Sequence, residues 1–237
     1  MKDVNQMDSK INGSKVIINL ATGRYVVGQT RLATSLANVG YNGSFMAWQN
    51  EASIGAPPHN QNPYAFKIHG FRKAEELGHR YVLWLDASVW AIRDVQPVFD
   101  HIDKHGYIMQ EAGHNCGRWA SDFQLDYFGI DRDEASKMLM YGNAGFLGLD
   151  LWDTRAKTFL ISWEKAMKAG AFKGNWTNKH QEVSKDPRCD GCRHDMSAGS
   201  IIANQLNMKY QDAGDWLAYA RPEEEVRETV IFKAMGI

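Results

Sequence analysis

Residues 81–88 are Tyr-Val-Leu-Trp-Leu-Asp-Ala-Ser, an unbroken apolar run that ends in a carboxylate. The run 81–85 is too short for a helix and rich in residues that favour strands, so it predicts a strand buried on both faces of a sheet. Open α/β sheets bind ligands in the crevice beyond the carboxyl ends of their strands. Asp86 is therefore predicted to face a ligand, and Ser88 can offer a second oxygen to the same cation. The alternative is that Asp86 only caps the next turn.

The composition fits one large α/β domain. The chain has 237 residues, of which 44% are hydrophobic and 11% aromatic, and we expect a flexible tail over 1–14 and a single domain over 15–237. The formal net charge of −1 lacks the overall basic character that non-specific nucleic-acid binding needs. No run approaches the roughly 20 apolar residues of a membrane span, and residues 1–12 lack the apolar centre of a signal peptide, so a cytoplasmic protein is expected.

The three cysteines fit a reducing compartment better than a disulfide framework. Cys189 and Cys192 form the segment Cys-Asp-Gly-Cys. Together with His194, and with His114 or Cys116 from elsewhere in the chain, they would provide the ligands of a structural zinc site. The alternative is a pair of ordinary reduced thiols on a tight Asp-Gly turn.

A strand, a loop and a helix open the predicted domain. Residues 15–20 are rich in β-branched side chains (Val16, Ile17 and Ile18) and predict a buried strand, after which the spacing of Leu32 and Leu36 predicts a helix. The loop after the first strand of such a sheet usually faces the nucleotide. No Gly-x-Gly-x-x-Gly or Walker pattern is present, which argues against a dinucleotide-binding enzyme or a P-loop NTPase. The candidates for base and ribose contacts, with a structural turn as the alternative, are Thr22, Gly23 and Tyr25.

The middle of the chain adds further strands and helices. Residues 44–49 predict a second strand, and Asn62 with Pro63 predicts the start of a helix that ends at Gly78. Residues 106–110 predict a strand that ends at Glu111, a carboxylate placed after its strand as Asp86 is.

The second half contains two loops suited to an acceptor. Residues 112–119 predict a polar loop in which Trp119 stacks on a ring of the acceptor. Residues 141–149 predict a strand interrupted by glycines, which indicates a close approach of the backbone to another group. Residues 170–193 lack periodicity and exceed the roughly 12–15 residues of ordinary loops, so we expect an acceptor loop or lid.

The C-terminal part begins with a helix N-terminus. His194 and Asp195 precede a helix marked by Ile201 and Ile202, and such a position favours anions, with a simple helix cap as the alternative for Asp195. The acidic residues after Pro222 predict the start of a last helix.

The order of these elements and the segment 83–88 resemble the nucleotide-sugar-dependent glycosyltransferases of the GT-A fold. In that family the corresponding strand commonly ends in Asp-x-Asp, whereas here Ser88 offers a neutral hydroxyl in place of the second acid. The segment Asn143-Ala144-Gly145 is similar to the family's Asn-Ala-Gly strand. The resemblance covers about residues 15–210 and implies a mixed, mainly parallel sheet flanked by helices.

The resemblance also implies a nucleotide-sugar donor, most simply a UDP-sugar, and Mn²⁺ or Mg²⁺ as cofactor. It assigns Lys67 to the donor diphosphate, Asn143 to the hydroxyls of the donor sugar, and His194 or Asp195 to the metal, the diphosphate or the acceptor hydroxyl. The complete set of expected site residues is Asp86, Ser88 and His194 for the metal, Thr22, Gly23, Tyr25, Lys67, Asn143 and Arg193 for the donor, and Asp195 and Glu111 for catalysis.

Glycosyl transfer requires stabilisation of the diphosphate leaving group and correct placement of an acceptor hydroxyl. Inversion of configuration also requires a base, for which Asp195, Glu111 and His194 are available, whereas retention does not. Two alternatives are a sugar-nucleotide nucleotidyltransferase, whose glycine-rich basic loop residues 21–24 match poorly, and a non-catalytic sugar- or nucleotide-binding protein. The acceptor is left open among a glycan, a lipid-linked intermediate, a protein side chain and a modified DNA base.

Overall fold

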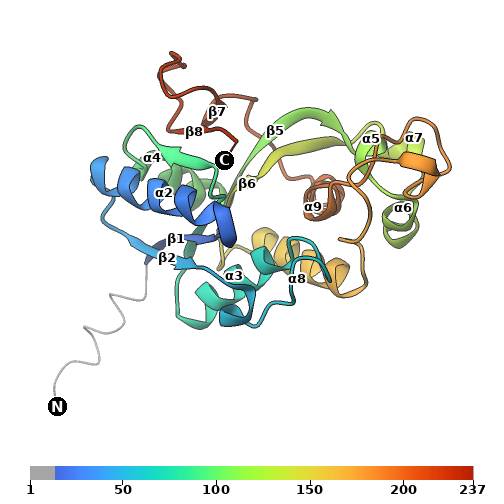
Figure 1. Cartoon of the computed structure of the whole chain (residues 1–237), viewed down its shortest axis with the longest axis horizontal. Helices are drawn as coiled ribbons and strands as arrows, with labels where there is room; N and C mark the ends of the chain where they lie inside the picture. The colour runs from blue at the N-terminus through green and yellow to red at the C-terminus, as the bar shows by residue number, and fades with distance from the viewer. Residues whose placement is uncertain (1–13, 237) are drawn as a thin grey trace.

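A five-stranded mixed sheet forms the centre of the protein (Figure 1). The computed structural model describes residues 14–236, without the side chains of residues 142–144, so most of the predicted tail lies outside the described residues. The strands, in their order across the sheet, are β2 (Ser44–Trp48), β1 (Lys15–Leu20), β3 (Tyr81–Leu85), β6 (Leu139–Asp150) and β5 (Tyr107–Asn115). β1 pairs in parallel with β2 and β3, and only β6 runs against its neighbours, which confirms the predicted mainly parallel sheet.

Helices cover both faces of this sheet. The longer helices are α2 (Val26–Asn38), α3 (Ala65–Glu76), α4 (Gln96–His105), α8 (Thr154–Lys168) and α9 (His194–Gln205). Along β3, Val82 and Trp84 pack into the core with α3, α8 and α9, whereas Leu83 and Leu85 pack into the core with α2 and α4. Because successive side chains of a strand point to opposite faces, a central strand covered on both sides must be apolar throughout. The prediction of a doubly buried strand over 81–85 is confirmed.

The strands β5 and β6 continue past β3 as a two-stranded arm. The arm carries three short helices, α5 (Cys116–Trp119), α6 (Asp122–Phe128) and α7 (Arg132–Ala135) (Figure 1). The predicted end of a strand at Glu111 is therefore wrong, because Glu111 pairs with Tyr141 inside β5. β6 is long enough to supply hydrogen-bond partners beyond the sheet, so β5 continues to Asn115. The loop predicted over 112–119 is a strand end and a helical turn instead.

The helix α3 begins later than predicted. Asn62 does not cap it, since its side-chain amide donates to the carbonyl of Met167 at 3.3 Å. The helix begins at Ala65, after Tyr64 adopts a left-handed backbone with φ 59°. Non-glycine residues rarely adopt this conformation, and it is concentrated at functional sites. The chain thus turns sharply where it enters α3.

A small second sheet holds the C-terminal segment. It consists of β4 (Val89–Ala91), β8 (Phe232–Ala234) and β7 (Leu217–Tyr219), with β8 in the middle. The helix predicted after Pro222 is wrong: the segment is irregular, and the ammonium group of buried Lys233 donates to the carbonyls of Arg221 (3.1 Å) and Pro222 (2.9 Å). Over residues 14–236, no helix is long and apolar enough to cross a bilayer.

We predict that Gly148→Ala lowers the free energy of unfolding by about 1–3 kcal/mol, because an added methyl group would overpack the core. A Cβ at Gly148 would lie 2.5 Å from Ile102 Cδ1 and 2.6 Å from Ile108 Cγ2. Urea denaturation measures the loss. Adding Ile102→Val removes the nearest methyl group and should recover part of it, whereas strictly additive losses would contradict this packing.

Candidate active site

Asp86 follows the last residue of β3, at the carboxyl end of the strand. Its backbone N–H donates to Gly145 O at 2.9 Å, and its Oδ1 accepts from Trp84 Nε1 at 2.6 Å. A Cβ at Gly145 would lie 2.9 Å from Asp86 Oδ2, so this glycine leaves room for the carboxylate. With 37% of its side chain exposed, Asp86 is held on one edge and open on the other.

A lysine and a second carboxylate lie behind Asp86. Lys67 Nζ, from α3, lies 3.6 Å from Asp86 Oδ1 and 3.0 Å from Asp195 Oδ2, which comes from the first turn of α9. The side chains of Lys67 and Asp195 are only 2% and 3% exposed. Burying either charge without the other would be costly, so Lys67 and Asp195 must be brought into contact when the protein folds. Three segments distant in sequence thus converge on one charged cluster, with one cation and two carboxylates.

The cluster shifts the acidity of its members. Burial raises the pKa of Asp195 to about 6, Asp86 adds to this effect, and the ammonium group of Lys67 opposes it. Burial alone would lower the pKa of Lys67, but the carboxylates of Asp195 and Asp86 outweigh it and raise this pKa. At neutral pH the cluster therefore contains charged Lys67 and charged Asp195, and mild acidification protonates Asp195.

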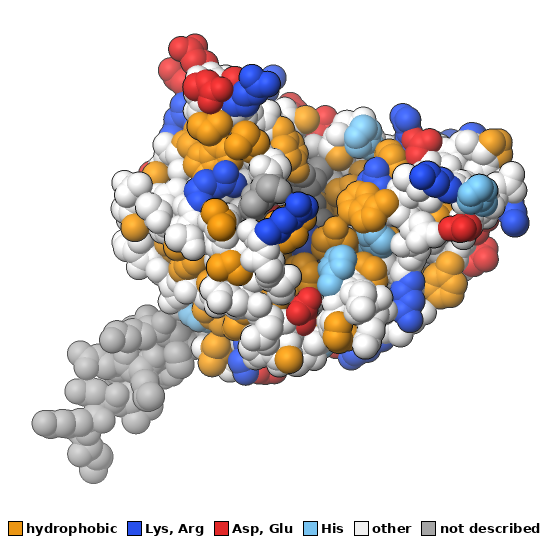
Figure 2. Space-filling view, in the orientation of Figure 1, with side chains coloured by type: hydrophobic (Ala, Val, Ile, Leu, Met, Phe, Trp, Pro, Cys, Tyr) orange, Lys and Arg blue, Asp and Glu red, His pale blue; other side chains and the backbone are white. Residues whose placement is uncertain are grey.

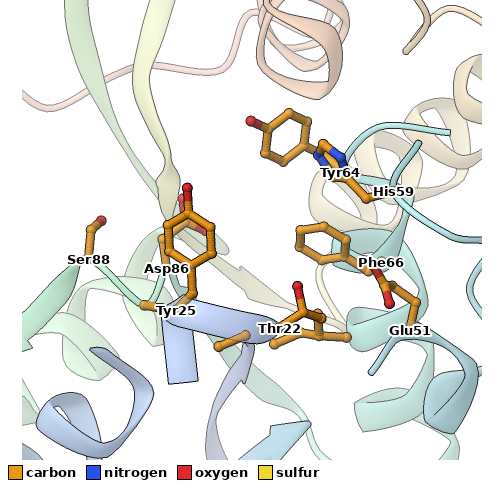
Figure 3. Close-up of a pocket in the computed structure, with 11 residues that line it drawn as sticks. Thr22, Tyr25, Glu51, His59, Tyr64, Phe66, Asp86 and Ser88 are labelled. Carbon is orange, nitrogen blue, oxygen red and sulfur yellow. The ribbon is translucent and has the colours of Figure 1, made fainter. Parts of the chain in front are cut away.

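Asp86 lines a cavity of about 400 Å³, which is within the usual range for small-molecule sites. Thr22 and Tyr25, from the loop after β1, lie on one wall, and Tyr64 and Phe66, from the start of α3, lie opposite (Figure 3). Gly23 lies between Thr22 and Tyr25 with φ 54°, a conformation that favours glycine. The remaining lining residues are Leu20, Ala21, Glu51, His59, Ala87 and Ser88.

Several residues around Asp86 and the cavity were not identified from the sequence. Trp84 lies two residues before Asp86 and therefore on the same side of the strand, a period-two signal that could have identified it. Tyr64 and Phe66 gave no such signal, because their place depends on the turn before α3. Burial lowers the pKa of His59, so a neutral imidazole lies on the cavity wall.

A buried pair of amide side chains lies behind the wall of the cavity next to β1. Gln29 Nε2, from α2, donates to Asn19 Oδ1 at 2.8 Å and to Trp48 O at 2.9 Å. Asn19 Nδ2, in β1, donates in turn to Leu85 O at 2.6 Å. These hydrogen bonds join the ends of β1, β2 and β3, and so fix the backbone just before Asp86.

The structure separates Arg193 and His194 from this cluster. The Arg193 guanidinium lies between two indole rings, with Cζ 3.6 Å from the centroid of Trp119 and 4.3 Å from that of Trp176. His194 Nδ1 lies 2.9 Å from Phe172 O, and its ring packs against Tyr64 and Trp176.

The other expected site residues are dispersed. Ser88 lines the same cavity, but stands apart from Asp86 in Figure 3, and its carbonyl accepts from Arg31 Nη2 at 2.8 Å. Glu111 lies on the arm and does not line the cavity. Asn143 is in β6, but its side chain lies outside what the structure describes.

The set of zinc ligands predicted from the sequence is not assembled. Within residues 14–236, no group of three or more His, Cys, Asp or Glu side chains is arranged to hold a metal ion. Cys189 and Cys192 lie in a small apolar cluster with Val183, and Cys116 donates to Leu139 O instead. Burial raises the pKa of Cys192 to about 11 and also raises that of Cys189, so both are ordinary thiols in this structure.

Comparison with known proteins gives the fold. No protein-family model matches the sequence, and no curated protein matches it. Mouse xyloside xylosyltransferase 1, in its apo form, superposes with a TM-score of 0.52 over 94% of this chain and 97% of its own, at 9% identity. The apo structure of WbbM, a bifunctional glycosyltransferase, gives 0.53 over 92% of this chain and 41% of its own, at 10% identity.

The likeness to these two glycosyltransferases covers nearly the whole chain. It agrees with the mixed sheet, the parallel order of β2, β1 and β3, and the helices on both faces. The protein therefore has a GT-A-like α/β fold.

We predict that Lys67→Met lowers the free energy of unfolding at pH 8 by about 3–5 kcal/mol, because Asp195 is left as a buried charge without this partner. The loss should be smaller at pH 5. The folded-state pKa of Asp195 already exceeds its ordinary value, so the folded state takes up a proton first and regains stability as the pH falls.

The matched control for this prediction is Lys168→Met, which removes an exposed lysine paired with Glu164. Its loss should stay within about 0.5 kcal/mol at both pH values. An equal loss for Lys67→Met at pH 5 and pH 8, measured by urea denaturation, would refute the charged cluster.

Proposed function

We propose that the protein is a glycosyltransferase that uses a nucleoside-diphosphate sugar, with a UDP-sugar as donor. The observation that carries the proposal is the Lys67–Asp86–Asp195 cluster, which lies at the carboxyl end of β3 and opens through Asp86 onto the cavity. The fold favours this place for a ligand. The likeness of the fold to two glycosyltransferases supports this class of reaction as an analogy of fold.

In the proposed reaction, the acceptor oxygen bonds to the anomeric carbon while the bond from this carbon to the diphosphate breaks, and the hydroxyl proton passes to a base or to the departing diphosphate. Negative charge develops on the diphosphate. Lys67 supplies a fixed positive charge beside this position. Such preorganised charge is worth more in a site that excludes water than in bulk solvent. Asp195 is buried against Lys67, so we assign to it the positioning of the ammonium group.

A divalent cation fits the proposed site when the donor is bound. Mg²⁺ is commonly held by one or two protein carboxylates together with the phosphates of a substrate. Asp86 Oδ2 is the available carboxylate oxygen, and Ser88 lines the same cavity. The ion would neutralise charge on the diphosphate, in addition to the charge supplied by Lys67. His194 is less suited to this role, since its ring is packed between Tyr64 and Trp176.

The nucleoside would occupy the wall next to β1. On this wall Tyr25 offers an aromatic surface to a base and Thr22 offers a hydroxyl, and Phe66 faces them from the opposite wall. The amide pair Gln29 and Asn19 keeps this wall at a fixed distance from Asp86.

A screen of hydrolysis across UDP-, GDP- and TDP-sugars tests the donor, and titration of UDP with and without Mn²⁺ tests the cation. Failure to bind any of these nucleotides in either condition would contradict the proposed function.

Asp86→Asn should lower the rate of donor hydrolysis by about 100-fold or more, because the amide cannot hold a cation or balance Lys67. The amide oxygen can still accept from Trp84 Nε1, so the melting temperature should change little. Asp100→Asn, at an exposed position on α4, is the matched control and should retain the wild-type rate. Normal hydrolysis by Asp86→Asn would rule out the role given to this carboxylate.

The rate of donor hydrolysis should fall as the pH drops below about 6, by about tenfold for each further unit. The expected cause is protonation of Asp195, whose pKa is raised to about 6 by burial, and which then no longer holds Lys67 by charge. A pH–rate profile measures this fall in rate at low pH, and the profile of Asp195→Asn should not show it. A wild-type rate that stays constant between pH 7 and pH 5 would argue against positioning by Asp195.

A further inference from the structure

We infer that the surface formed by Tyr64, Trp119, Trp176 and Arg193, termed here the arginine strip, binds an acceptor that is a carbohydrate carrying a negatively charged group. The inference rests on the proposed function, and it narrows the acceptor, which that function leaves open. The strip combines aromatic rings for a sugar face with one guanidinium for an anion.

The guanidinium of Arg193 is held rigidly. It is stacked between the rings of Trp119 and Trp176, and its Nη1 donates to Trp176 O at 2.9 Å. Burial lowers the pKa of Arg193, but a guanidinium remains protonated in proteins at neutral pH. A planar cation fixed by stacking loses little freedom when it binds a carboxylate or a phosphate.

Arg193 makes no ion pair among the described residues, since Asp190, whose charge acts on it from a longer distance, pairs with Arg118. Arg118 pairs with Asp190, and Arg188 pairs with Asp186 and Asp133. A guanidinium that is partly buried without an anion favours a ligand that supplies one.

The strip is continuous with the cavity of the donor. The ring of Trp176 contacts the ring of Tyr64, with centroids 6.4 Å apart, and Tyr64 lines the cavity. Trp176 is also 50% exposed, so part of its indole ring is accessible to a ligand. The C–H face of a pyranose ring packs well on such an aromatic surface, whose polar edge remains hydrated. Figure 2 shows hydrophobic, histidine and basic side chains around a hollow in this face of the protein.

The charge of the strip selects among acceptors. A polyanion such as DNA is bound through many basic contacts, whereas the strip offers one unpaired guanidinium, and the chain has a net charge of −1. A neutral acceptor would leave Arg193 without an anion. An acidic sugar, with its charge in a carboxylate or a phosphate, satisfies both the rings and the guanidinium.

An array of immobilised oligosaccharides tests the inference, with neutral, uronic-acid-containing and phosphorylated members. The full chain should bind the acidic oligosaccharides more strongly than the neutral ones. Comparing the uronic-acid-containing oligosaccharides with the phosphorylated ones shows whether a carboxylate or a phosphate is preferred. Arg193→Gln should lower this retention by about tenfold or more, the usual effect of losing a hydrogen-bonded ion pair. Trp176→Ala should lower it by about fivefold or more, from loss of the stacking surface.

Arg221→Gln is the matched control, since it removes one exposed arginine near β8 and should leave retention unchanged. Circular dichroism checks that each variant is folded. If Arg193→Gln unfolds, Trp176→Ala decides the matter, because this half-exposed residue can be removed with less loss of packing. The inference is overturned if wild type is not retained, if neutral members are retained equally well, or if Trp176→Ala leaves retention unchanged.

The array does not require a donor, so its failure is distinguishable from failure of the proposed function. Hydrolysis of a UDP-sugar without retention of acidic sugars would remove the strip as an acceptor site and leave the donor site intact. Retention of acidic sugars without any nucleotide binding would keep the strip as a binding site and remove the transferase.

Discussion

The buried ion pair between Lys67 and Asp195 is the interaction on which the architecture of the site depends. An ammonium group and a carboxylate, each nearly inaccessible to water, are stable in a core only if each has the other within reach. Their elements, α3 and α9, must therefore pack in one relative position on the sheet. The half-exposed carboxylate of Asp86 then completes the cluster from the end of β3 and connects it with the cavity. These charges are concentrated beside the cavity, whereas the side chains of β3 itself are apolar or aromatic.

The backbone around this cluster is shaped to leave space. A side chain at Gly145 would crowd the carboxylate of Asp86, since an added Cβ would lie 2.9 Å from its Oδ2. Tyr64 adopts a left-handed conformation, so the chain turns before α3 and both Tyr64 and Phe66 line the cavity. On the opposite wall, the hydrogen bonds of Asn19 and Gln29 join the ends of three strands. These features make the cavity a fixed part of the scaffold, as preorganised electrostatic stabilisation requires.

The two proposals divide the basic residues between two ligands. Lys67 serves the donor, because it lies beside Asp86, and Arg193 serves the acceptor, because it is stacked between indole rings farther along the same surface. The ring of Tyr64 lines the cavity and contacts Trp176, so it connects the two ligand sites. A donor and an acceptor bound in this way would meet near Tyr64, which is the geometry that transfer between two bound substrates needs.

The sequence by itself determined the central strands and the place of Asp86. The run 81–85 is apolar or aromatic at every position, and residues 15–20 are apolar apart from Lys15 and Asn19, so both runs favour a sheet that is covered on both faces. Asp86 had to end its strand there, since a carboxylate cannot continue into that core. The tertiary structure alone decided which cation it meets. From the sequence, Lys67 and Arg193 were both candidates for the positive charge beside the diphosphate. The packing of α3 places Lys67 in the core beside Asp86, whereas the guanidinium of Arg193 lies against Trp119 and Trp176. Glu111 shows the same limit: whether a strand ends depends on the length of its partner, and β6 extends β5 past that carboxylate. Local patterns specify strands and helices, whereas the partner of a side chain depends on contacts between segments far apart in the chain.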